Sequence, residues 1–286
     1  MKNNRFFVSV DFEDWYHLPY LDKYGFNKYR FDSYCEQTLF FFKFLKEQNI
    51  KATVFVVGDI AKQHAELLKK IDAMGHEIAC HSLHHKGVNL QSDIEFENET
   101  KVAKAEIESI IGHEIYGFRA PSFSMTIEKL NILKKLGFKY DASFINSTAN
   151  EYYNLMDITK FDHVEGIVYN INGLFEFETP TFKFFSKRLP FAGGGFFRLY
   201  PFCFYKFIAK RFMKKSKTFM FFVHPYEIVG TKFPGSKALS LKDSFRINIR
   251  RKSVFKRFKK AIKLADNDTK FISYLDYVEE CNKNEF

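Results

Sequence analysis

The chain has 286 residues, of which 46% are hydrophobic and 27% are charged, and its formal net charge at pH 7 is +10. This length is enough for one large domain or two small ones with a substantial core, and the composition is that of an ordinary globular protein. The first residues, MKNNRFFVSVDFEDW, reach acidic side chains after only a short apolar run, which excludes a secretory signal and a transmembrane helix at this position.

The four cysteines, Cys35, Cys80, Cys203 and Cys281, are widely spaced and form neither a CxxC pair nor a zinc-ribbon pattern. We therefore expect reduced, mostly buried thiols. Together with the absence of a signal sequence at the start, this pattern predicts a cytoplasmic location.

The first half of the chain alternates short apolar runs with helical patterns, which is typical of βα units around a parallel sheet. Strands are expected at 6–10, 52–57, 77–80 and 116–119 and in the residues that lead into Tyr140. Helices are expected at 33–48, 60–74, about 93–111 and about 126–136.

The second half begins with a stretch of different composition, 147–201, which is rich in Asn, Tyr, Gly and Phe. We interpret it as a β-rich excursion within the domain, because no Pro/Ser-rich linker separates it. A helix after Pro201, a strand at 218–223, a basic helix, a strand at 271–273 and a last helix are expected to follow.

Three carboxylates, Asp11, Glu13 and Asp14 in the run DFEDW, follow the first predicted strand. In α/β sheets and barrels, polar groups at the C-terminal ends of strands line the active site. Clustered carboxylates are costly to ionise together unless a cation neutralises them. A bound metal, or one carboxylate that acts as a base, is therefore expected; a solvated acidic loop is the alternative for this motif alone.

The run CHSLHH, at 80–85, follows the third predicted strand. His81 and His85 are four residues apart, which places both imidazoles on one face if the segment is helical, whereas His84 would point elsewhere. Two imidazoles and one carboxylate form a site with open positions that suits Zn²⁺ or a related divalent ion. The acidic strand end favours this metal site over a structural role for the histidines.

Reactive groups follow three other predicted strands. Arg119 in GFRAPSF can keep a nearby carboxylate base ionised, and Pro121 rigidifies a loop whose backbone N–H groups can face an oxyanion. Asp141 follows the next strand, and His224, after the strand at 218–223, is a candidate general acid. Each residue alone would more often be structural, but several reactive strand ends together indicate an active site.

The ordered set DFED, HSLHH, RAPS, YDAS and FVHPYE resembles the polysaccharide deacetylase family, also called the NodB-homology or carbohydrate esterase family four. The segment GGGFFRLYP and the tail through FRINIRRKSVFKRF are similar to the branch with a distinct C-terminal extension, found in bacterial exopolysaccharide and surface-glycan loci. The resemblance covers nearly the whole chain. It implies one α/β domain: a distorted (β/α) barrel with a β-rich insertion, a core of about 5–230 and a basic helical extension of about 231–286.

Carried over to this sequence, the resemblance makes Asp11 the base that activates a metal-bound water and makes His81 and His85 two of the metal ligands. It makes His224 the acid that protonates the leaving amine, and Arg119 the residue that orients Asp11. The implied cofactor is a divalent metal ion, Zn²⁺ before Co²⁺ or Ni²⁺.

The resemblance also implies that the backbone near Ser122 stabilises the oxyanion, that Asp141 supports the acid side of the site and that Trp15 lies near the substrate. The third metal ligand stays open between two residues. On a regular strand Glu13 shares a face with the base, whereas Asp14 is freer to reach the metal if the strand has ended, and Asp14 is slightly preferred. Two departures from the family pattern, Ser122 in place of Tyr and the missing Trp after the fourth motif, concern substrate preference.

The implied reaction is hydrolysis of an N-acetyl group, or less favourably an O-acetyl group, on an amino sugar of a glycan or a lipid-linked glycan precursor. Basic residues concentrated at 210–217 and 246–260 suit a solvated helix face, or peripheral contact with a membrane. No nucleic-acid partner is expected. The rival hypotheses are a metal-independent C–N hydrolase of the same fold, allantoinase-like, and a non-catalytic module that binds glycan or membrane.

Overall fold

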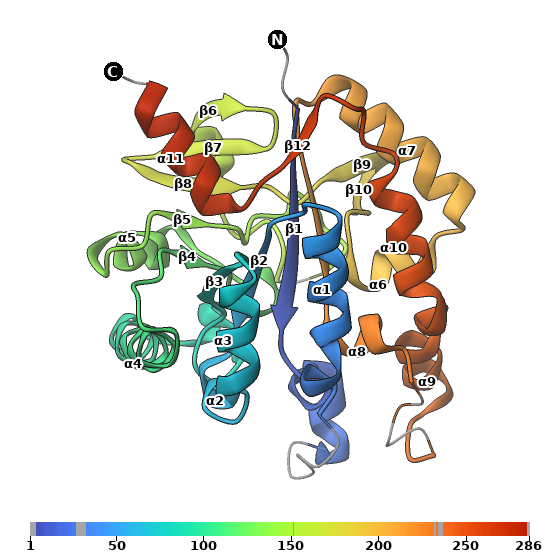
Figure 1. Ribbon diagram of the computed structural model, residues 1–286, viewed down its shortest axis with the longest axis horizontal. Coiled ribbons are helices and arrows are strands. Elements are labelled where there is room, and N and C mark those ends of the chain that lie inside the picture. Colours follow the sequence, from blue (N-terminus) through green and yellow to red (C-terminus); the bar gives the residue numbers. More distant parts are fainter. Residues whose placement is uncertain (1–3, 27–32, 151, 232, 234–236, 285–286) are drawn as a thin grey trace.

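The computed structural model describes residues 4–26, 33–150, 152–231, 233 and 237–284. Within these residues the chain forms a strongly curved sheet surrounded by helices, an α/β fold of the distorted-barrel type (Figure 1). The strand order in the main sheet is β11-β1-β2-β3-β4-β5-β8-β7-β6, and β12 also pairs with β1. The pairs from β11 through to β5 are parallel, whereas β6, β7 and β8 form an antiparallel meander.

The strands of the main sheet are β1 (Asn4–Phe12), β2 (Ala52–Val56), β3 (Glu77–Cys80), β4 (Gly117–Phe118), β5 (Tyr140–Asp141), β6 (Asp162–Glu165), β7 (Val168–Ile171), β8 (Leu174–Phe177), β11 (Thr218–Val223) and β12 (Thr269–Phe271). A separate hairpin consists of β9 (Thr181–Phe184) and β10 (Lys187–Pro190). The helices are α1 (Leu39–Glu47), α2 (Gly58–Ala61), α3 (Ala65–Ala73), α4 (Asp93–Ile111), α5 (Ile127–Lys135), α6 (Gly194–Leu199), α7 (Phe202–Lys215), α8 (Pro225–Val229), α9 (Leu241–Asn248), α10 (Val254–Ile262) and α11 (Tyr274–Asn284).

Local sequence explains why these elements form where they do. Strands β2 and β11 are short, continuous apolar runs that are buried on both faces, as parallel strands covered by helices require. Helix α4 begins at Ser92, whose side chain accepts a hydrogen bond from the backbone N–H of Glu95. It ends at Gly112, which has the left-handed conformation (φ 82°) common after a helix.

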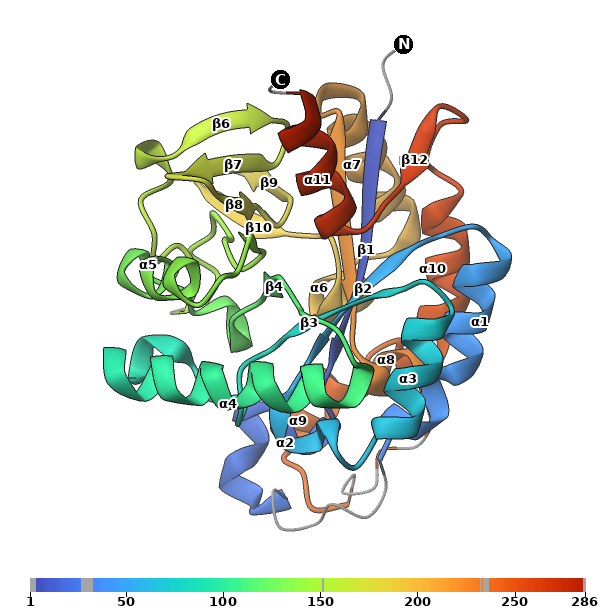
Figure 2. The same cartoon turned by 60° about the vertical axis from the view of Figure 1, so that its left-hand side comes forward.

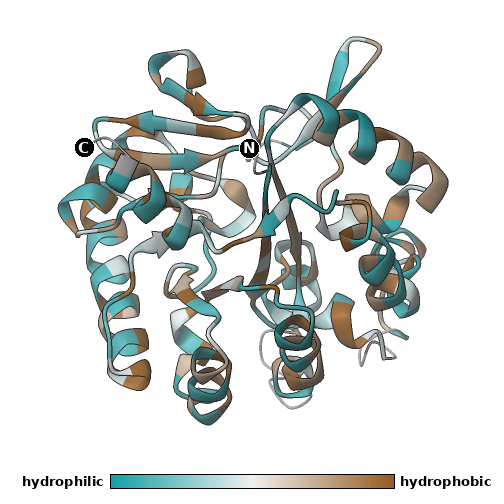
Figure 3. Ribbon diagram, turned by 45° about the horizontal axis from the view of Figure 1, so that its top comes forward, coloured by the Kyte–Doolittle hydropathy of each residue, from teal (hydrophilic) through white to brown (hydrophobic). Residues whose placement is uncertain are grey.

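Apolar side chains fill both sides of the sheet. Outside it, the helices cover a large core; Figure 3 shows brown strands at the centre and helices that alternate teal and brown. Inside it, Phe7, Phe55 and Tyr140 pack around Tyr274 at the start of α11, and Phe7 and Tyr274 stack with ring centroids 4.9 Å apart. Figure 2 shows α11 beside the start of β1 and the β6–β8 meander. This interior core closes the end of the barrel opposite the C-terminal ends of the strands.

The predicted elements are confirmed for most of the chain, and the differences are local. The helix expected at 33–48 starts with a 3₁₀ turn, Cys35–Thr38, and the one expected at 60–74 is split into α2 and α3. The single basic helix is wrong: α9, a 3₁₀ turn and α10 occupy this region, because Arg250 takes a left-handed conformation (φ 48°) that ends α9. The last strand lies two residues earlier than expected, at Thr269–Phe271.

Candidate active site

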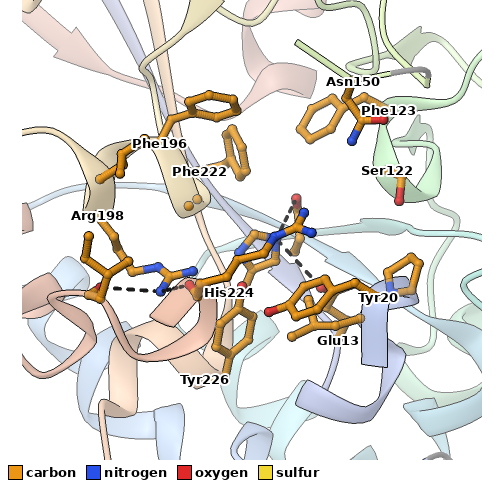
Figure 4. Close-up of a pocket in the computed structure, with 18 of the residues that line it drawn as sticks. Glu13, Tyr20, Ser122, Phe123, Asn150, Phe196, Arg198, Phe222, His224 and Tyr226 are labelled. Atoms are coloured by element: carbon orange, nitrogen blue, oxygen red, sulfur yellow. Dashed lines mark hydrogen bonds and ion pairs between the residues drawn. The ribbon is translucent and has the colours of Figure 1, made fainter. Parts of the chain in front are cut away.

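The C-terminal ends of β1, β3 and β11 meet at the floor of a pocket of about 440 Å³. Five predicted site residues line this floor: Asp11, Glu13, His81, His85 and His224. Figure 4 shows Glu13 and His224 in one row with Tyr20 and Arg198, below the aromatic rings of Phe123, Phe196 and Phe222 in that view. Convergence of separate strand ends is the arrangement that the sequence predicted.

Glu13, His81 and His85 form a group that could hold a metal ion, because their ligand atoms lie within 4.8 Å of one another and all three residues are buried. Glu13 Oε2 lies 3.9 Å from His81 Nε2 and forms a short contact with His85 Nε2. This oxygen is buried and makes no hydrogen bond of ordinary geometry within the described residues. A carboxylate and two imidazoles aimed at one point suit a divalent ion such as Zn²⁺.

The preference for Asp14 as the residue beside the histidines is corrected. Asp14 Oδ1 accepts hydrogen bonds from the backbone N–H groups of Trp15 and Tyr34, both at 3.0 Å, and so caps the turn after β1. Its side chain therefore lies with Cys35 and His64, on the other side of the backbone from Glu13. Strand β1 extends through Phe12, so alternation continues far enough to put Glu13 on the same face as the base.

The helical geometry proposed for the histidine motif is also wrong. Residues 81–87 form an irregular loop in which Ser82 and His85 have positive φ values, 66° and 54°. These two left-handed residues turn the chain back, so both imidazoles still face one point. His84 points elsewhere, as predicted, and pairs with Asp59 at 2.8 Å.

A backbone carbonyl orients His81. Its Nδ1 donates a hydrogen bond to the carbonyl oxygen of Arg119 at 2.7 Å, which leaves Nε2 with its lone pair facing Glu13. Burial lowers the pKa of His81 to about 4, so the neutral form needed for a metal ligand predominates at neutral pH. Burial alone would raise the pKa of Glu13, but His85, His224 and His81 lower it to about 2, so this carboxylate is ionised.

Asp11 is held by Arg119 within the barrel. Arg119 Nη1 donates to Asp11 Oδ1 at 2.5 Å and to Ser9 Oγ at 2.9 Å, and Nη2 donates to the hydroxyl of Tyr274 at 3.1 Å. The guanidinium is completely buried and stacks 4.1 Å above the ring centroid of Phe55. Arg119 thus fixes one oxygen of Asp11 and leaves Oδ2 facing the pocket floor, which is the orienting role predicted for it.

His224 faces the floor from the end of β11. Its Nε2 lies 3.8 Å from Asp11 Oδ2 and 3.7 Å from Glu13 Oε1, and its Nδ1 lies 2.8 Å from Glu227 Oε2. Burial opposes the charged form, but Glu227 and then the floor carboxylates outweigh it and raise the pKa of His224 to about 9. His224 is therefore a protonated donor at neutral pH in this arrangement.

Sequence analysis missed the two residues that hold His224. Glu227 is buried and also accepts a hydrogen bond from Arg198 Nε at 2.6 Å, so a chain of contacts runs from Arg198 through Glu227 to His224. Arg198 belongs to the GGGFFRLYP segment. Gly193 lets this segment approach β11, since a Cβ there would lie 2.2 Å from the carbonyl oxygen of Phe222. The FVHPYE and GGGFFRLYP motifs contained both residues, but only the fold shows that they meet.

The remaining predicted residues differ in where they lie: one lines the pocket and two are buried away from it. Ser122 lines the pocket in a turn with a positive φ of 54°, consistent with a backbone role there. Trp15 is 2% exposed, packs against Phe26 and Phe233 and is not among the residues that line the pocket, and its contact with substrate stays a prediction. Asp141 is buried behind the floor, where it accepts a hydrogen bond from Ser143 Oγ at 2.8 Å; it contacts neither His224 nor the pocket.

Comparison with known proteins finds two family models that match consecutive parts of the chain. Residues 30–140 match the family model for polysaccharide deacetylase, and residues 143–279 match a domain of unknown function, DUF3473. A peptidoglycan-N-acetylglucosamine deacetylase of Bacillus cereus is 36% identical over 81 residues, which cover 28% of this chain and 30% of that protein. A chitooligosaccharide deacetylase of Azorhizobium caulinodans is 28% identical over 96 residues, which cover 33% of this chain and 46% of that protein.

The matches to these curated relatives therefore span less than half of each relative's length. Similarity in structure extends further. A crystal structure from Mycobacterium smegmatis, assigned to the polysaccharide deacetylases, has a TM-score of 0.62 at 16% identity, over 99% of this chain and 92% of that chain. At this identity the comparison shows a shared fold.

Proposed function

We propose that this chain is a metal-dependent hydrolase that removes an N-acetyl group from an amino sugar, since residues 30–140 match the family model for polysaccharide deacetylase. The observation that carries the proposal is the floor of the pocket. A candidate metal triad, Glu13, His81 and His85, lies beside an oriented carboxylate, Asp11, and a protonated imidazole, His224.

The residues of the floor fit the chemistry of amide hydrolysis. When bound to the triad, a divalent ion would acidify a water molecule toward pKa about 7 and polarise the acetamide carbonyl. Asp11 Oδ2 is placed to accept a proton from the attacking water, since Arg119 occupies its other oxygen. His224 Nε2 is placed to donate a proton to the leaving nitrogen, which departs poorly as an unprotonated anion.

Buried hydrogen-bond partners determine which ring nitrogen of His224 and of His81 faces the pocket. Glu227 engages Nδ1 of His224, so Nε2 is the atom that transfers the proton. The carbonyl of Arg119 engages Nδ1 of His81, so Nε2 is free to bind a metal. Arg119 therefore orients two floor residues: its side chain holds Asp11, and its backbone carbonyl holds His81.

The substrate we propose is an acetylated amino-sugar glycan of a surface polysaccharide, or a precursor of it. The support is that the two curated relatives described above are named for N-acetylglucosamine-containing substrates, peptidoglycan and chitooligosaccharide. No helix in the described part of the chain is long and apolar enough to cross a membrane. We also propose a cytoplasmic location, and peripheral membrane contact through the basic residues of α7 and α10, many of which are exposed.

The decisive experiment measures acetate release from N-acetylglucosamine oligosaccharides, acetamido sugars and lipid-linked intermediates, before and after removal of metal with a chelator. Activity that disappears with chelator and returns with Zn²⁺, Co²⁺ or Ni²⁺ is the expected result. Undiminished acetate release by metal-free protein would instead favour the metal-independent C–N hydrolase. Glycan binding without acetate release from any substrate would favour the non-catalytic module.

A further inference from the structure

One wall of the pocket, formed by α9, carries two cations. Lys242 and Arg246 line the same pocket as the floor, and both are exposed. The other arginine that lines the pocket, Arg198, is neutralised by Glu227 at 2.6 Å. Neither Lys242 nor Arg246 forms an ion pair with any residue in the described ranges, so their charge is available to a ligand.

The nearest carboxylate on the same helix is directed elsewhere. Asp243 Oδ2 accepts hydrogen bonds from the hydroxyls of Tyr24 and Ser240, at 2.7 and 2.9 Å, and pairs with Lys23 at 2.6 Å. Asp243 thus contacts the 3₁₀ helix η2, Pro19–Tyr24, and does not line the pocket. The helix therefore presents uncompensated positive charge to the pocket.

The guanidinium of Arg246 is held in place before any ligand arrives. It stacks on Tyr20, with its carbon 4.0 Å from the ring centroid, and Tyr20 also lines the pocket. The backbone carbonyl of Arg246 accepts a hydrogen bond from Arg198 Nη1 at 3.1 Å, which fixes the end of α9 to the pocket wall. An arginine restrained on an aromatic ring loses less conformational entropy when its fork binds an anion.

Apolar side chains surround these cations. Phe196, Leu199, Phe245 and Ile249 line the same part of the pocket, and Phe245 is 62% exposed. Apolar side chains exclude water from the side of a cation that they contact and so strengthen an ionic contact on that side. A planar guanidinium in this setting is suited to the two oxygens of a carboxylate or a phosphate.

From these observations we propose that Lys242 and Arg246 form an anion-binding subsite, which takes an acidic group of the glycan beside the acetamido sugar at the floor. The acidic group is the carboxylate of a uronic acid or the phosphate of a precursor. This inference rests on the proposed function, because it names the substrate class of the same pocket. It makes α9 the element that selects acidic over neutral amino-sugar glycans.

The test compares three ligands that differ in charge. The neutral probe is the tetramer of N-acetylglucosamine; the carboxylate probe is a hyaluronan tetrasaccharide, in which N-acetylglucosamine alternates with glucuronic acid; the phosphate probe is UDP-N-acetylglucosamine. Dissociation constants are measured by calorimetry with the metal-loaded Asp11→Asn protein, chosen to prevent turnover. Acetate release is measured separately with the metal-loaded protein that retains Asp11.

We expect at least one acidic probe to bind about tenfold more tightly than the neutral tetramer. This preference corresponds to about 1.4 kcal/mol. Arg246→Gln and Lys242→Gln should each remove most of it, because each removes one of the two positive charges. Both variants should bind the neutral tetramer within about twofold of the protein that retains both residues. The matched control is Arg211→Gln on α7, an exposed arginine with no ion pair in the described part of the chain and no place in the pocket. It should leave all three constants unchanged.

Equal binding of neutral and acidic probes, or equal weakening of both by Arg246→Gln, would overturn the subsite. The proposed function fails in a different way. Acetate release from the neutral tetramer without acidic preference would remove only the subsite. Acidic preference that depends on Arg246, with no acetate release from any probe, would keep the subsite and contradict the deacetylase. Whether the carboxylate or the phosphate probe responds to Arg246→Gln identifies the source of the anion.

Discussion

Glu227 Oε2 lies 2.8 Å from His224 Nδ1 and 3.2 Å from the backbone nitrogen of the same residue, so one carboxylate oxygen holds both the ring and the main chain of His224. Because the contact engages Nδ1, the ring presents Nε2 to Asp11 and Glu13. Arg198 holds Glu227 in turn at 2.6 Å. The proposed proton donor, His224, is therefore oriented by a buried carboxylate, Glu227, and by the arginine that holds it.

Replacing Glu227 with Gln should lower the pKa of His224, because its carboxylate is the largest of the contributions that raise this pKa to about 9. A raised pKa keeps the proton on His224 as pH rises, so the alkaline limb of the kcat profile should move to lower pH in Glu227→Gln. We expect kcat at pH 8 to fall by about 10²-fold, the scale of general acid catalysis. The measurement is the pH dependence of acetate release.

The control for this variant is Glu178→Gln, a partly buried carboxylate outside the pocket that accepts a hydrogen bond from Tyr169. Thermal melting separates a catalytic effect from unfolding, since Glu227→Gln also leaves Arg198 without its carboxylate partner. A folded Glu227→Gln protein with an unshifted alkaline limb would contradict the proposed role of Glu227.

The metal content of two variants should show whether Glu13 or Asp14 is the third metal ligand. Glu13→Gln replaces a candidate carboxylate ligand with an amide, which binds metal more weakly. It should reduce metal affinity by at least about tenfold, since even substitution of residues that hydrogen-bond to metal ligands has effects of this size. Asp14→Asn should retain the metal, because Asp14 caps backbone N–H groups and asparagine can still accept those hydrogen bonds. Elemental analysis after dialysis gives the stoichiometry; the reverse pattern would restore Asp14 as the third ligand.

Asp11→Asn should keep the metal but lose turnover by about 10² to 10⁴-fold, the range expected when a general base is removed. The amide occupies nearly the same space but cannot take a proton from water. His85→Ala is the complementary variant, since it should lose metal and activity together. Full acetate release by metal-loaded Asp11→Asn would remove Asp11 from the role of base.

The buried acids Asp141 and Glu176 should make stability depend on pH. The two residues are paired across β5 and β8 and are fully buried. Burial raises the pKa of Asp141 from 3.8 to about 6, and burial together with the charge of Asp141 raises the pKa of Glu176 well above its usual value. Because the folded-state pKa of Asp141 exceeds its unfolded value, its contribution to stability is complete below about pH 4 and is lost as pH rises through about 6.

The prediction is measured by urea unfolding of the unsubstituted protein and Asp141→Asn between pH 4 and 7. The difference in unfolding free energy, unsubstituted minus variant, should fall as pH rises, because the raised pKa of Asp141 makes its ionisation unfavourable in the folded state. A difference that stays constant over this range would show that Asp141 does not carry the pH dependence.

The sequence was sufficient for the elements and for the identity of most floor residues, because the βα pattern implies which strand ends meet. It was not sufficient to decide which of two adjacent side chains faces the pocket, because a single turn of the backbone determines this. Glu13 and Asp14 are adjacent and chemically alike, and only the length of β1 and the backbone N–H groups of Trp15 and Tyr34 decide between them. The same holds for the loop of His85, whose positive φ has no signature in the spacing of histidines.

Contacts between distant segments were the other feature that the sequence could not predict. Arg198 and Glu227 were visible in the GGGFFRLYP and FVHPYE motifs, but nothing in either motif shows that one residue holds the other. The same applies to α9, where Arg246 meets Tyr20 across more than two hundred residues of chain. A single basic helix was expected in this region, whereas the structure has α9, which carries Arg246, a 3₁₀ turn and α10.

Strand β1 lies next to β11, the first strand of the main sheet, and pairs with β2, β11 and β12, which come from opposite ends of the chain. During synthesis the first strand leaves the ribosome long before β11, and such widely separated pairings slow folding. Until Thr218–Val223 has been made, β1 has an unpaired edge and Asp11 has no imidazole of His224 opposite it. The floor of the pocket is therefore assembled only after residues near both ends of the chain have been synthesised, and until then β1 has an exposed edge that could pair with another strand.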